Sequence, residues 1–261
     1  MLASIRSFFA ARDILEVQTP VLGEHTVTDP DVEAIAVDGY GYLQTSAEYF
    51  MKRLLAAGVP DCYTLAPAFR HEEHGRLHNA EFYMLEWYRL GFDATQLMGE
   101  VSALCDDVMG ADVYRTVTYQ QLVRDLQAPR DELDLRFAQA CEQLAPGRYF
   151  VVDYPADQAA LARVQPQRPE FAARFELIID GVEVANGYWE LKDAKEHQRR
   201  FAADLSTRRR RGSSEPGIDN RFVEALQAGL PDCAGVALGV DRLVMLTLGL
   251  HSLDDVLSFR R

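Results

Sequence analysis

Two largely apolar segments, residues 63–70 and 81–88, flank a polar stretch that contains His71, His74 and His78. Short runs of this kind, separated by polar residues, are typical of two antiparallel strands. The first run ends at Arg70, so a hairpin would place this arginine at a strand end beside a polar tip. The pair of segments therefore predicts an antiparallel sheet with a candidate site at the end of one of its strands.

A second arginine-bearing segment, residues 235–242, lies far away in the sequence, where small and apolar residues lead to Arg242. Residues 240–250 are predicted to form a buried helix, which puts Arg242 near its start. The chain has neither a G-x-x-x-x-G-K-[ST] loop nor a G-x-G-x-x-G sequence after a strand. Nucleotide chemistry would therefore depend on arginines, backbone groups and carboxylates.

Together, these two segments resemble motifs 2 and 3 of the class II aminoacyl-tRNA synthetases. Residues 69–72, followed by Asn79 and Phe82, correspond to motif 2, and residues 235–242 correspond to motif 3. The resemblance implies an α+β fold, in which helices flank an antiparallel sheet that binds ATP.

The same resemblance implies roles for individual residues. Arg70 would contact the α-phosphate and the substrate carboxylate, Arg242 would hold the γ-phosphate and cover one face of the adenine, and Phe82 would stack on the other face. Activation of a carboxylate requires that charge developing at the α-phosphorus be neutralised, so Arg70 and Arg242 are the implied catalytic residues. Taken singly, each of these residues would more simply be part of a surface ion pair or of the core, but their joint presence in this order favours the site. The implied ATP-binding residues are Arg70, His71, Glu72, Asn79, Phe82, Glu183, Val184, Gly239 and Arg242.

Two glutamates, Glu176 and Glu183, flank Asp180-Gly181, a dipeptide that favours a tight hairpin turn. Their carboxylates could approach each other across the paired strands, and hard oxygen ligands of this kind suit Mg²⁺ that bridges phosphates. Exposed strand carboxylates would be the simpler interpretation without the resemblance. Both residues match the metal-binding glutamates of lysyl-tRNA synthetases, which implies a Mg²⁺ site. The histidines of residues 71–78 do not form H-E-x-x-H, so we expect no metal there.

Residues 184–191 resemble the lysine-recognition segment of the lysine branch of the class II enzymes. By this resemblance Glu190, together with Tyr88, receives the ε-ammonium of the substrate, and Glu48 receives its other amino group. A carboxylate that faces a buried ammonium selects a cationic side chain, because a neutral analogue would leave the carboxylate unpaired. The implied substrate-binding residues are Ser46, Ala47, Glu48, Tyr88, Asn186, Glu190 and Ala237.

The beginning of the chain resembles motif 1, which forms the dimer interface of class II enzymes. Residues 2–11 have helical periodicity, and residues 14–19 alternate like a strand before Pro20. With motif 1 at about residues 1–20, motif 2 at about 63–88 and motif 3 at about 235–250, we expect one catalytic domain over residues 1–261. We expect a homodimer without an anticodon-binding domain.

The absence of that domain indicates a particular branch of the family. Ser46 and Ala237 stand where lysyl-tRNA synthetases usually have alanine and glycine. In both respects the chain resembles the freestanding lysyl-tRNA synthetase paralogues that ligate (R)-β-lysine to elongation factor P. The resemblance implies two steps, the formation of a β-lysyl-adenylate from ATP and the transfer of the acyl group to a lysine of elongation factor P.

The composition bears on whether tRNA could be the acceptor of the acyl group. The formal net charge of −13 weighs against extensive contact with tRNA, because neutralising phosphates requires a basic surface. The basic run Arg208–Arg211 before Gly212 is more simply a solvated helix end than a nucleic-acid contact. Four scattered cysteines indicate reduced thiols in the cytoplasm, and no apolar run is long enough for a membrane span.

The remaining pattern predicts several further elements. Residues 45–48 are expected to cap a helix over residues 49–55, and residues 94–109, 119–126, 133–144 and 194–211 are expected to be helical. Residues 148–154 and 171–186 are expected to be extended.

Two other functions remain open from the sequence alone. One is a lysine-type synthetase-like enzyme that acts on tRNA or on a carrier. The other is a catalytically inactive paralogue that senses lysine or ATP, although such a protein would have no need of Arg70, Glu72, Glu176, Glu183 and Arg242.

Overall fold

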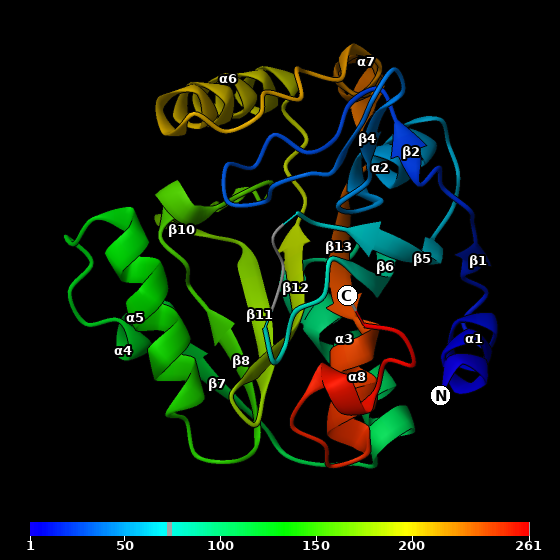
Figure 1. The fold of residues 1–261 in the computed structure, drawn as a ribbon, viewed down its shortest axis with the longest axis vertical. Coiled ribbons are helices and arrows are strands. Elements are labelled where there is room, and N and C mark those ends of the chain that lie inside the picture. Colours follow the sequence, from blue (N-terminus) through cyan, green and yellow to red (C-terminus); the bar gives the residue numbers. More distant parts are fainter. Residues whose placement is uncertain (72–74, 261) are drawn as a thin grey trace.

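The computed structural model describes residues 1–71 and 75–260, and its centre is one mixed sheet with eight strands in that part of the chain (Figure 1). The strand order is β1-β5-β6-β13-β12-β11-β8-β7. The outer pairs β1–β5 and β7–β8 are parallel, and the pairs between them are antiparallel. The strands of this sheet are β1 (Leu15–Glu16), β5 (Cys62–Phe69), β6 (Glu81–Leu90), β7 (Tyr114–Thr118), β8 (Arg148–Val152), β11 (Arg174–Ile179), β12 (Val182–Trp189) and β13 (Cys233–Gly239).

Helices and two small sheets surround the central sheet, as expected for an α+β fold. In Figure 1, α6 and α7 lie at one end of the sheet, and α4 and α5 lie beside β7 and β8. The small sheets are formed by β2 (Leu22–Gly23), β3 (Ala36–Val37) and β4 (Gly41–Leu43), and by β9 (Val164–Gln165) and β10 (Arg168–Ala172). The helices are α1 (Leu2–Ala10), α2 (Glu48–Ala56), α3 (Ala94–Met109), α4 (Tyr119–Leu122), α5 (Arg130–Glu142), α6 (Ala194–Arg211), α7 (Asn220–Gly229) and α8 (Val240–Thr247), with 3₁₀ turns at η1 (Ala156–Gln158) and η2 (Leu253–Asp255).

The central strands separate a core face from a polar face. On the core face, Trp87, Val236, Gly187 and Phe175 are neighbours across β6, β13, β12 and β11. This face packs against apolar side chains of α1 and α3. Gly187 is needed there, because a Cβ on it would lie 2.4 Å from the ring of Phe175. Successive residues of a strand point to opposite sides, so the alternate residues of the same strands face away from this core.

Most of the expected elements are confirmed. The hairpin of β5 and β6 pairs Cys62 with Tyr88 and Phe69 with Glu81. The predicted helices over residues 94–109 and 194–211 have the bounds of α3 and α6. The Asp180-Gly181 turn joins β11 to β12, and both residues have positive φ (48° and 79°), as a tight hairpin turn requires.

Other expected elements differ in extent. The strand expected over residues 14–19 is reduced to β1, since it pairs only with the end of β5 at the sheet edge. The helix expected over residues 119–126 ends at Leu122, and the helix expected over residues 133–144 corresponds to α5, which begins after Pro129. The extended residues 171–186 belong to three strands, β10, β11 and β12. Ala47, whose side chain has no acceptor oxygen, occupies the N-cap of α2, while the hydroxyl of Ser46 accepts a hydrogen bond from the Glu48 N–H at 3.1 Å.

The C-terminal end of α6 is only partly the solvated end that the sequence indicates. Gly212 ends the helix with φ 72°, in the left-handed region, as expected. Arg208, however, is 0% exposed and donates hydrogen bonds to the backbone oxygens of Thr28, Asp29 and Val32 at 2.9, 2.6 and 2.5 Å. This arginine therefore fixes the loop of residues 28–33, and only the rest of the basic run is exposed.

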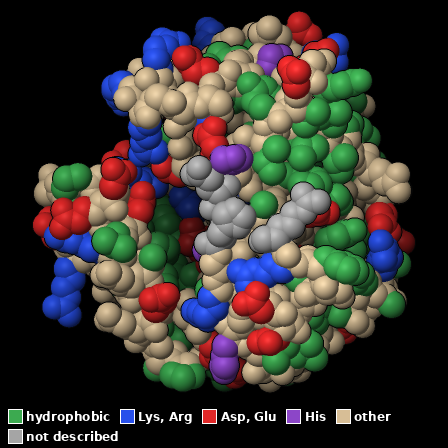
Figure 2. Space-filling view, in the orientation of Figure 1, with side chains coloured by type: hydrophobic (Ala, Val, Ile, Leu, Met, Phe, Trp, Pro, Cys, Tyr) green, Lys and Arg blue, Asp and Glu red, His purple; other side chains and the backbone are tan. Residues whose placement is uncertain are grey.

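Apolar side chains gather on the surface formed by the N-terminal part of the chain. Figure 2 shows hydrophobic side chains over the region of β1, β2 and β5. Leu2, Leu15, Val21 and Leu22 are 43%, 48%, 40% and 37% exposed. Contiguous apolar surface of this kind commonly marks a protein contact. Within the described residues, no helix combines the length and apolar character that crossing a membrane requires.

Candidate active site

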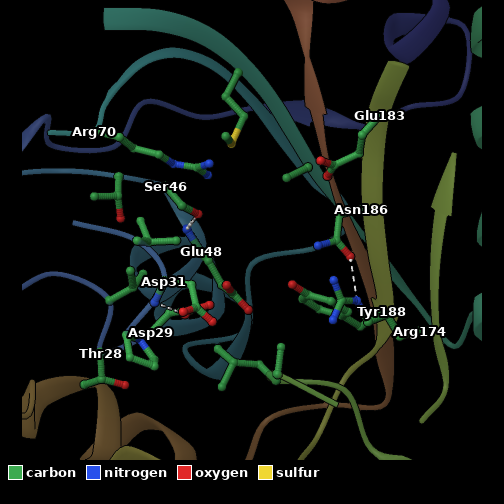
Figure 3. Close-up of a pocket in the computed structure, with 18 of the residues that line it drawn as sticks. Thr28, Asp29, Asp31, Ser46, Glu48, Arg70, Arg174, Glu183, Asn186 and Tyr188 are labelled. Carbon is green, nitrogen blue, oxygen red and sulfur yellow. Dashed lines mark hydrogen bonds between the residues drawn. The ribbon is translucent and has the colours of Figure 1, made fainter. Parts of the chain in front are cut away.

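The polar face of the central sheet forms the floor of a cavity of about 1330 Å³. Its walls come from α2, from the loop of residues 28–33 and from α6, which are far apart in the sequence. Figure 3 shows Arg70, Glu48, Asn186 and Tyr188 arranged around one central space. The cavity therefore brings together the two arginine segments and the segment that resembles a lysine-recognition site.

Strand register places the polar residues of the floor in two rows. Glu86, Ala237 and Asn186 are neighbours across β6, β13 and β12. In the same way, Tyr88, Gly235 and Tyr188 are neighbours one step further along these strands. The small residues in the middle strand, Ala237 and Gly235, leave open space between the larger side chains on both sides.

One end of the cavity contains Arg70, Asn79 and Phe82 of the predicted ATP site. The guanidinium carbon of Arg70 lies 5.1 Å from the centroid of the Phe82 ring. Two buried polar atoms here, Arg70 Nε and Asn79 Oδ1, make no hydrogen bond to the described residues. Buried polar atoms normally have partners, so this end fits a polar ligand such as a nucleotide.

Arg242 connects the second arginine segment to this end of the cavity. Its Nη1 donates to the backbone oxygen of Glu183 at 2.9 Å, and its Nε donates to the backbone oxygen of Leu77 at 3.2 Å. Gly239 occupies the N-cap of α8, so Arg242 lies in the first turn of that helix as expected. The tip of the β5–β6 hairpin, strand β12 and helix α8 therefore meet at this arginine.

The two predicted metal ligands lie on the hairpin of β11 and β12. Glu176 is 5% exposed, and its Oε1 accepts a hydrogen bond from Arg174 at 2.5 Å. Burial raises the pKa of the Glu176 carboxyl to about 7, and nearby Glu183 adds to this rise, whereas Arg174 opposes it. Glu183 is exposed, and its Oε2 lies 3.6 Å from Nη1 of Arg242.

This geometry fits a bridging cation only in part. The described residues contain no group of three or more His, Cys, Asp or Glu side chains that could hold a metal ion. Two neighbouring carboxylates can still bind Mg²⁺ when phosphate oxygens and water supply the other ligands, which is the usual arrangement with nucleotides. Arg174 already occupies one oxygen of Glu176, so a cation would have to share that carboxylate.

The opposite end of the cavity is built around Glu190, which is 1% exposed. Its Oε2 forms an ion pair with Nζ of Lys52 at 2.6 Å, and neither of its buried oxygens meets the geometry of a hydrogen bond with the described part of the chain. Lys52 Nζ also lies 2.5 Å from Oε1 of Glu48. Burial raises the pKa of the Glu190 carboxyl, and the ammonium of Lys52 opposes that rise. Tyr88 lies next to Glu190, and both contact the space that a side chain on Gly235 would fill.

The sequence interpretation missed three charged residues of this site. Glu86 lines the cavity, accepts a hydrogen bond from the Ala47 N–H at 2.6 Å, and has a carboxyl pKa that burial raises to about 7. The signal for Glu86 was its position two residues before Tyr88 in a strand, which puts both side chains on one face. Arg174 pairs in register with Tyr188, but nothing in the local sequence distinguishes it. Lys52 follows Glu48 by four residues, so both lie on one face of α2.

The cavity unites most of the residues predicted to bind ATP or substrate. Ala47 is buried against Glu86, and Glu176 lies beside the lining residue Arg174. His71 is exposed, and its N–H donates to the backbone oxygen of Glu33 at 2.8 Å. Glu72 lies outside the described residues. The predicted residues that line the cavity are Ser46, Glu48, Arg70, Asn79, Phe82, Tyr88, Glu183, Val184, Asn186, Glu190, Ala237, Gly239 and Arg242.

Comparison with known proteins agrees with this architecture. The model of the family described as tRNA synthetases class II (D, K and N) matches residues 1–261, and the chain belongs to this family. It is 42% identical to a protein of Vibrio cholerae named elongation factor P–(R)-beta-lysine ligase, over 99% of this chain and 92% of the relative. Proteins of the same name from Vibrio atlanticus and Salmonella paratyphi B are each 41% identical, over 99% of this chain and 93% and 92% of their own lengths.

Proposed function

We propose that this chain activates (R)-β-lysine with ATP and transfers the β-lysyl group to a lysine side chain of elongation factor P. The names of its relatives support the pair of substrates. One observation in the structure supports the proposal most directly. The buried Oε1 of Glu190, which makes no hydrogen bond to the described residues, lies at one end of a cavity whose other end contains Arg70 and Arg242. An elongated molecule with a terminal ammonium and a carboxylate would match both ends.

In the first step, a carboxylate oxygen of the amino acid attacks the α-phosphorus of ATP. A β-lysyl-adenylate forms, and pyrophosphate leaves. Arg70 would bind the carboxylate and the α-phosphate, which aligns the reactants and neutralises developing charge. Arg242 would bind the γ-phosphate, and Phe82 would stack on the adenine. Mg²⁺ bound by Glu176 and Glu183 would offset negative charge on the phosphates.

The amino groups of the substrate would be recognised by the carboxylates of the cavity. Glu190 and Tyr88 would receive the ε-ammonium, and Glu48 the amino group on the β-carbon. Ser46 and Ala237 would shape the space around that second group. Their positions support this role, because Ala237 lies between Glu86 and Asn186, and the Ser46 hydroxyl donates to Glu86 at 3.0 Å.

In the second step, the ε-amine of the acceptor lysine attacks the acyl carbon of the adenylate. An amide bond forms, AMP leaves, and the amine loses a proton. The net charge of −13 supports a protein acceptor over tRNA, whose phosphates a basic surface would bind. A translation factor as acceptor would place the reaction in the cytoplasm.

A homodimer is part of the proposal. The exposed apolar side chains Leu2 and Leu15 belong to the segment that resembles the class II dimer interface, and Val21 and Leu22 follow it directly. A charged residue in place of Leu15 would oppose burial of this surface. We expect sedimentation to give a dimer for the wild-type chain and a monomer for Leu15→Asp.

Pyrophosphate exchange is the experiment that tests the activity. The purified chain is incubated with ATP, labelled pyrophosphate and one amino acid, and (R)-β-lysine is expected to support faster exchange than α-lysine. Mass spectrometry of elongation factor P should then show the addition of one β-lysyl group. Failure of every amino acid to support exchange contradicts the proposal. Charging of tRNA without transfer to protein would show that tRNA, and not elongation factor P, is the acceptor.

A further inference from the structure

Lys52 is a buried cation that no step of the proposed reaction uses. It lies in the second turn of α2 and is 0% exposed, behind the wall of the cavity. Its ammonium lies between two carboxylates, 2.5 Å from Glu48 Oε1 and 2.6 Å from Glu190 Oε2. These are the carboxylates proposed to receive the two amino groups of the substrate.

The ammonium of Lys52 determines the charge state of this end of the cavity. Burial alone would lower the pKa of Lys52, but Glu190 and Glu48 raise it above its ordinary value, so the amine stays protonated. A buried carboxylate without a cation takes up a proton instead of remaining charged. Lys52 therefore opposes the effect of burial on Glu190 and favours its ionised form before any substrate arrives.

Lys52 also divides the oxygens of Glu190. Oε2 pairs with Nζ of Lys52 at 2.6 Å, whereas Oε1 borders the space at Gly235, on which a Cβ would lie 2.5 Å away. The two carboxylates outnumber the one ammonium, so the field at this end of the cavity favours a further cation beside Oε1.

We infer that Lys52 is a positioning residue for substrate specificity: it holds Glu190 ionised and directs Oε1 toward the ammonium of the incoming amino acid. The inference rests on the proposed function and deepens it. Lys52 does not touch the substrate. It acts through Glu190 and Glu48, which is why the loss of its charge should reduce discrimination between cationic and neutral amino acids.

A role in stability alone would have different consequences. Removal of a purely structural buried charge lowers the melting temperature and reduces activity with all amino acids alike. A positioning role changes the KM for a cationic amino acid selectively, because a protonated Glu190 has no charge with which to attract it.

The test uses Lys52→Met in the full chain, since methionine is close to lysine in length and has no charge. We expect the KM for (R)-β-lysine in pyrophosphate exchange to rise by about tenfold or more, with the KM for ATP within about twofold of wild type. The Ki of a neutral isostere, a β-amino acid with a butyl side chain, should fall. Lys195→Met, at the exposed start of α6, is the matched control and should behave as wild type. A folded Lys52→Met variant with unchanged KM and Ki would overturn the inference.

A second measurement does not require the Lys52 variant to fold. The chain has three lysines, so Lys192→Arg together with Lys195→Arg leaves Lys52 as the single lysine. In ¹⁵N-lysine NMR of this variant, the Nζ signal should shift when (R)-β-lysine is added and should stay in place with the neutral isostere. An unchanged signal at saturating (R)-β-lysine would overturn the inference. Lack of exchange by the wild-type chain would overturn the proposed function and this inference together, whereas an active wild type with an indifferent Lys52 would overturn the inference alone.

Discussion

Gly235 and Tyr88 are register partners on β13 and β6, and a Cβ on Gly235 would lie 2.3 Å from Cε1 of the Tyr88 ring. The same Cβ would lie 2.5 Å from Oε1 of Glu190. Contacts this short do not occur, so the absence of a side chain at Gly235 allows both groups to approach one point. The end of the cavity that would hold the substrate ammonium therefore depends on a residue with no chemistry of its own.

Gly235→Ala is expected to displace Tyr88 and Glu190. We expect a rise of about tenfold or more in the KM for (R)-β-lysine, with the KM for ATP nearly unchanged, and a loss of about 1–3 kcal/mol in unfolding free energy from overpacking. Exchange kinetics and urea unfolding measure the two effects. Gly99→Ala, in α3, is the control, since a Cβ there would meet nothing within 4 Å. A Gly235→Ala enzyme with normal KM would show that Tyr88 and Glu190 do not contact the amino acid.

Glu190→Gln preserves the size of the side chain and removes its charge. We expect the KM for (R)-β-lysine to rise by about a hundredfold, because a buried amide replaces the carboxylate that compensates the ammonium. The neutral isostere should be affected much less. Glu132→Gln, on the exposed surface of α5, should leave both values unchanged. Equal loss for cationic and neutral compounds would assign Glu190 a structural role only.

Arg70→Lys separates geometry from charge at the ATP end. A lysine keeps the positive charge but cannot make two parallel hydrogen bonds to a carboxylate or phosphate. We expect kcat for exchange to fall by about 10²–10³-fold, as for other groups that stabilise developing charge. Arg136→Lys, on α5, is the control. Retention of full activity in Arg70→Lys would exclude a bidentate contact of Arg70 with a carboxylate or phosphate in the transition state.

Arg208→Met tests the buried end of α6. The substitution leaves the backbone oxygens of Thr28, Asp29 and Val32 without their donor, and Glu33 without its ion pair. We expect a loss of about 3–5 kcal/mol in unfolding free energy, as measured by denaturant titration. Arg209→Met should change it by less than about 0.5 kcal/mol, because this arginine is exposed. Similar values for the two variants would contradict the role of Arg208 in fixing the loop.

His197 predicts a particular pH dependence of stability. Burial, with a smaller effect of Lys52, lowers the pKa of His197 to about 4, whereas an unfolded histidine has a pKa of about 6.5. Between these values the unfolded chain binds a proton that the folded chain does not, so stability falls as the pH drops from about 6.5 to 4. The loss from this residue amounts to at most about 3 kcal/mol.

The contribution of His197 has to be isolated from that of other groups. Glu86 and Asp204 have carboxyl pKa values that burial raises to about 7 and about 6, and these groups favour the folded state as the pH falls. The difference in unfolding free energy between wild type and His197→Gln cancels the contributions of Glu86 and Asp204, because both proteins contain these groups. Glutamine is the replacement because its side chain keeps a donor for the backbone oxygen of Leu191. We expect this difference in unfolding free energy to change between pH 6.5 and 4. A constant difference would show that His197 does not stay neutral in the folded protein.

Local pattern predicted several of the elements that form the site, although it did not predict β13. The two apolar segments around a polar tip, residues 63–70 and 81–88, predicted β5 and β6, and the Asp180-Gly181 dipeptide predicted the β11–β12 turn. These signals are reliable because strand period and turn conformation depend on neighbouring residues. The resemblance then supplied the residues, and most of them line one cavity.

What the sequence interpretation missed depends on long-range packing. Lys52 resembles an ordinary surface lysine on an amphipathic helix until Glu190, which directly follows the distant strand β12, is placed 2.6 Å away. The end of α6 resembles a solvated basic run until the loop of residues 28–33 closes over Arg208. In both cases a cation is buried by a segment that arrives from elsewhere in the chain, which periodicity cannot reveal.

The alternation of β13 between core and cavity has a consequence for how this protein can change over evolution. Val236 and Leu238 belong to the core, and Gly235 and Ala237 border the cavity. A point substitution at Gly235 or Ala237 can change the amino-acid selectivity while the core stays intact. Insertion or deletion of a single residue in β13 would instead turn the valine and leucine toward the substrate and the small residues toward the interior, with the loss of both. New specificities in this lineage should therefore arise through point substitutions at every second residue, with the length of the strand preserved.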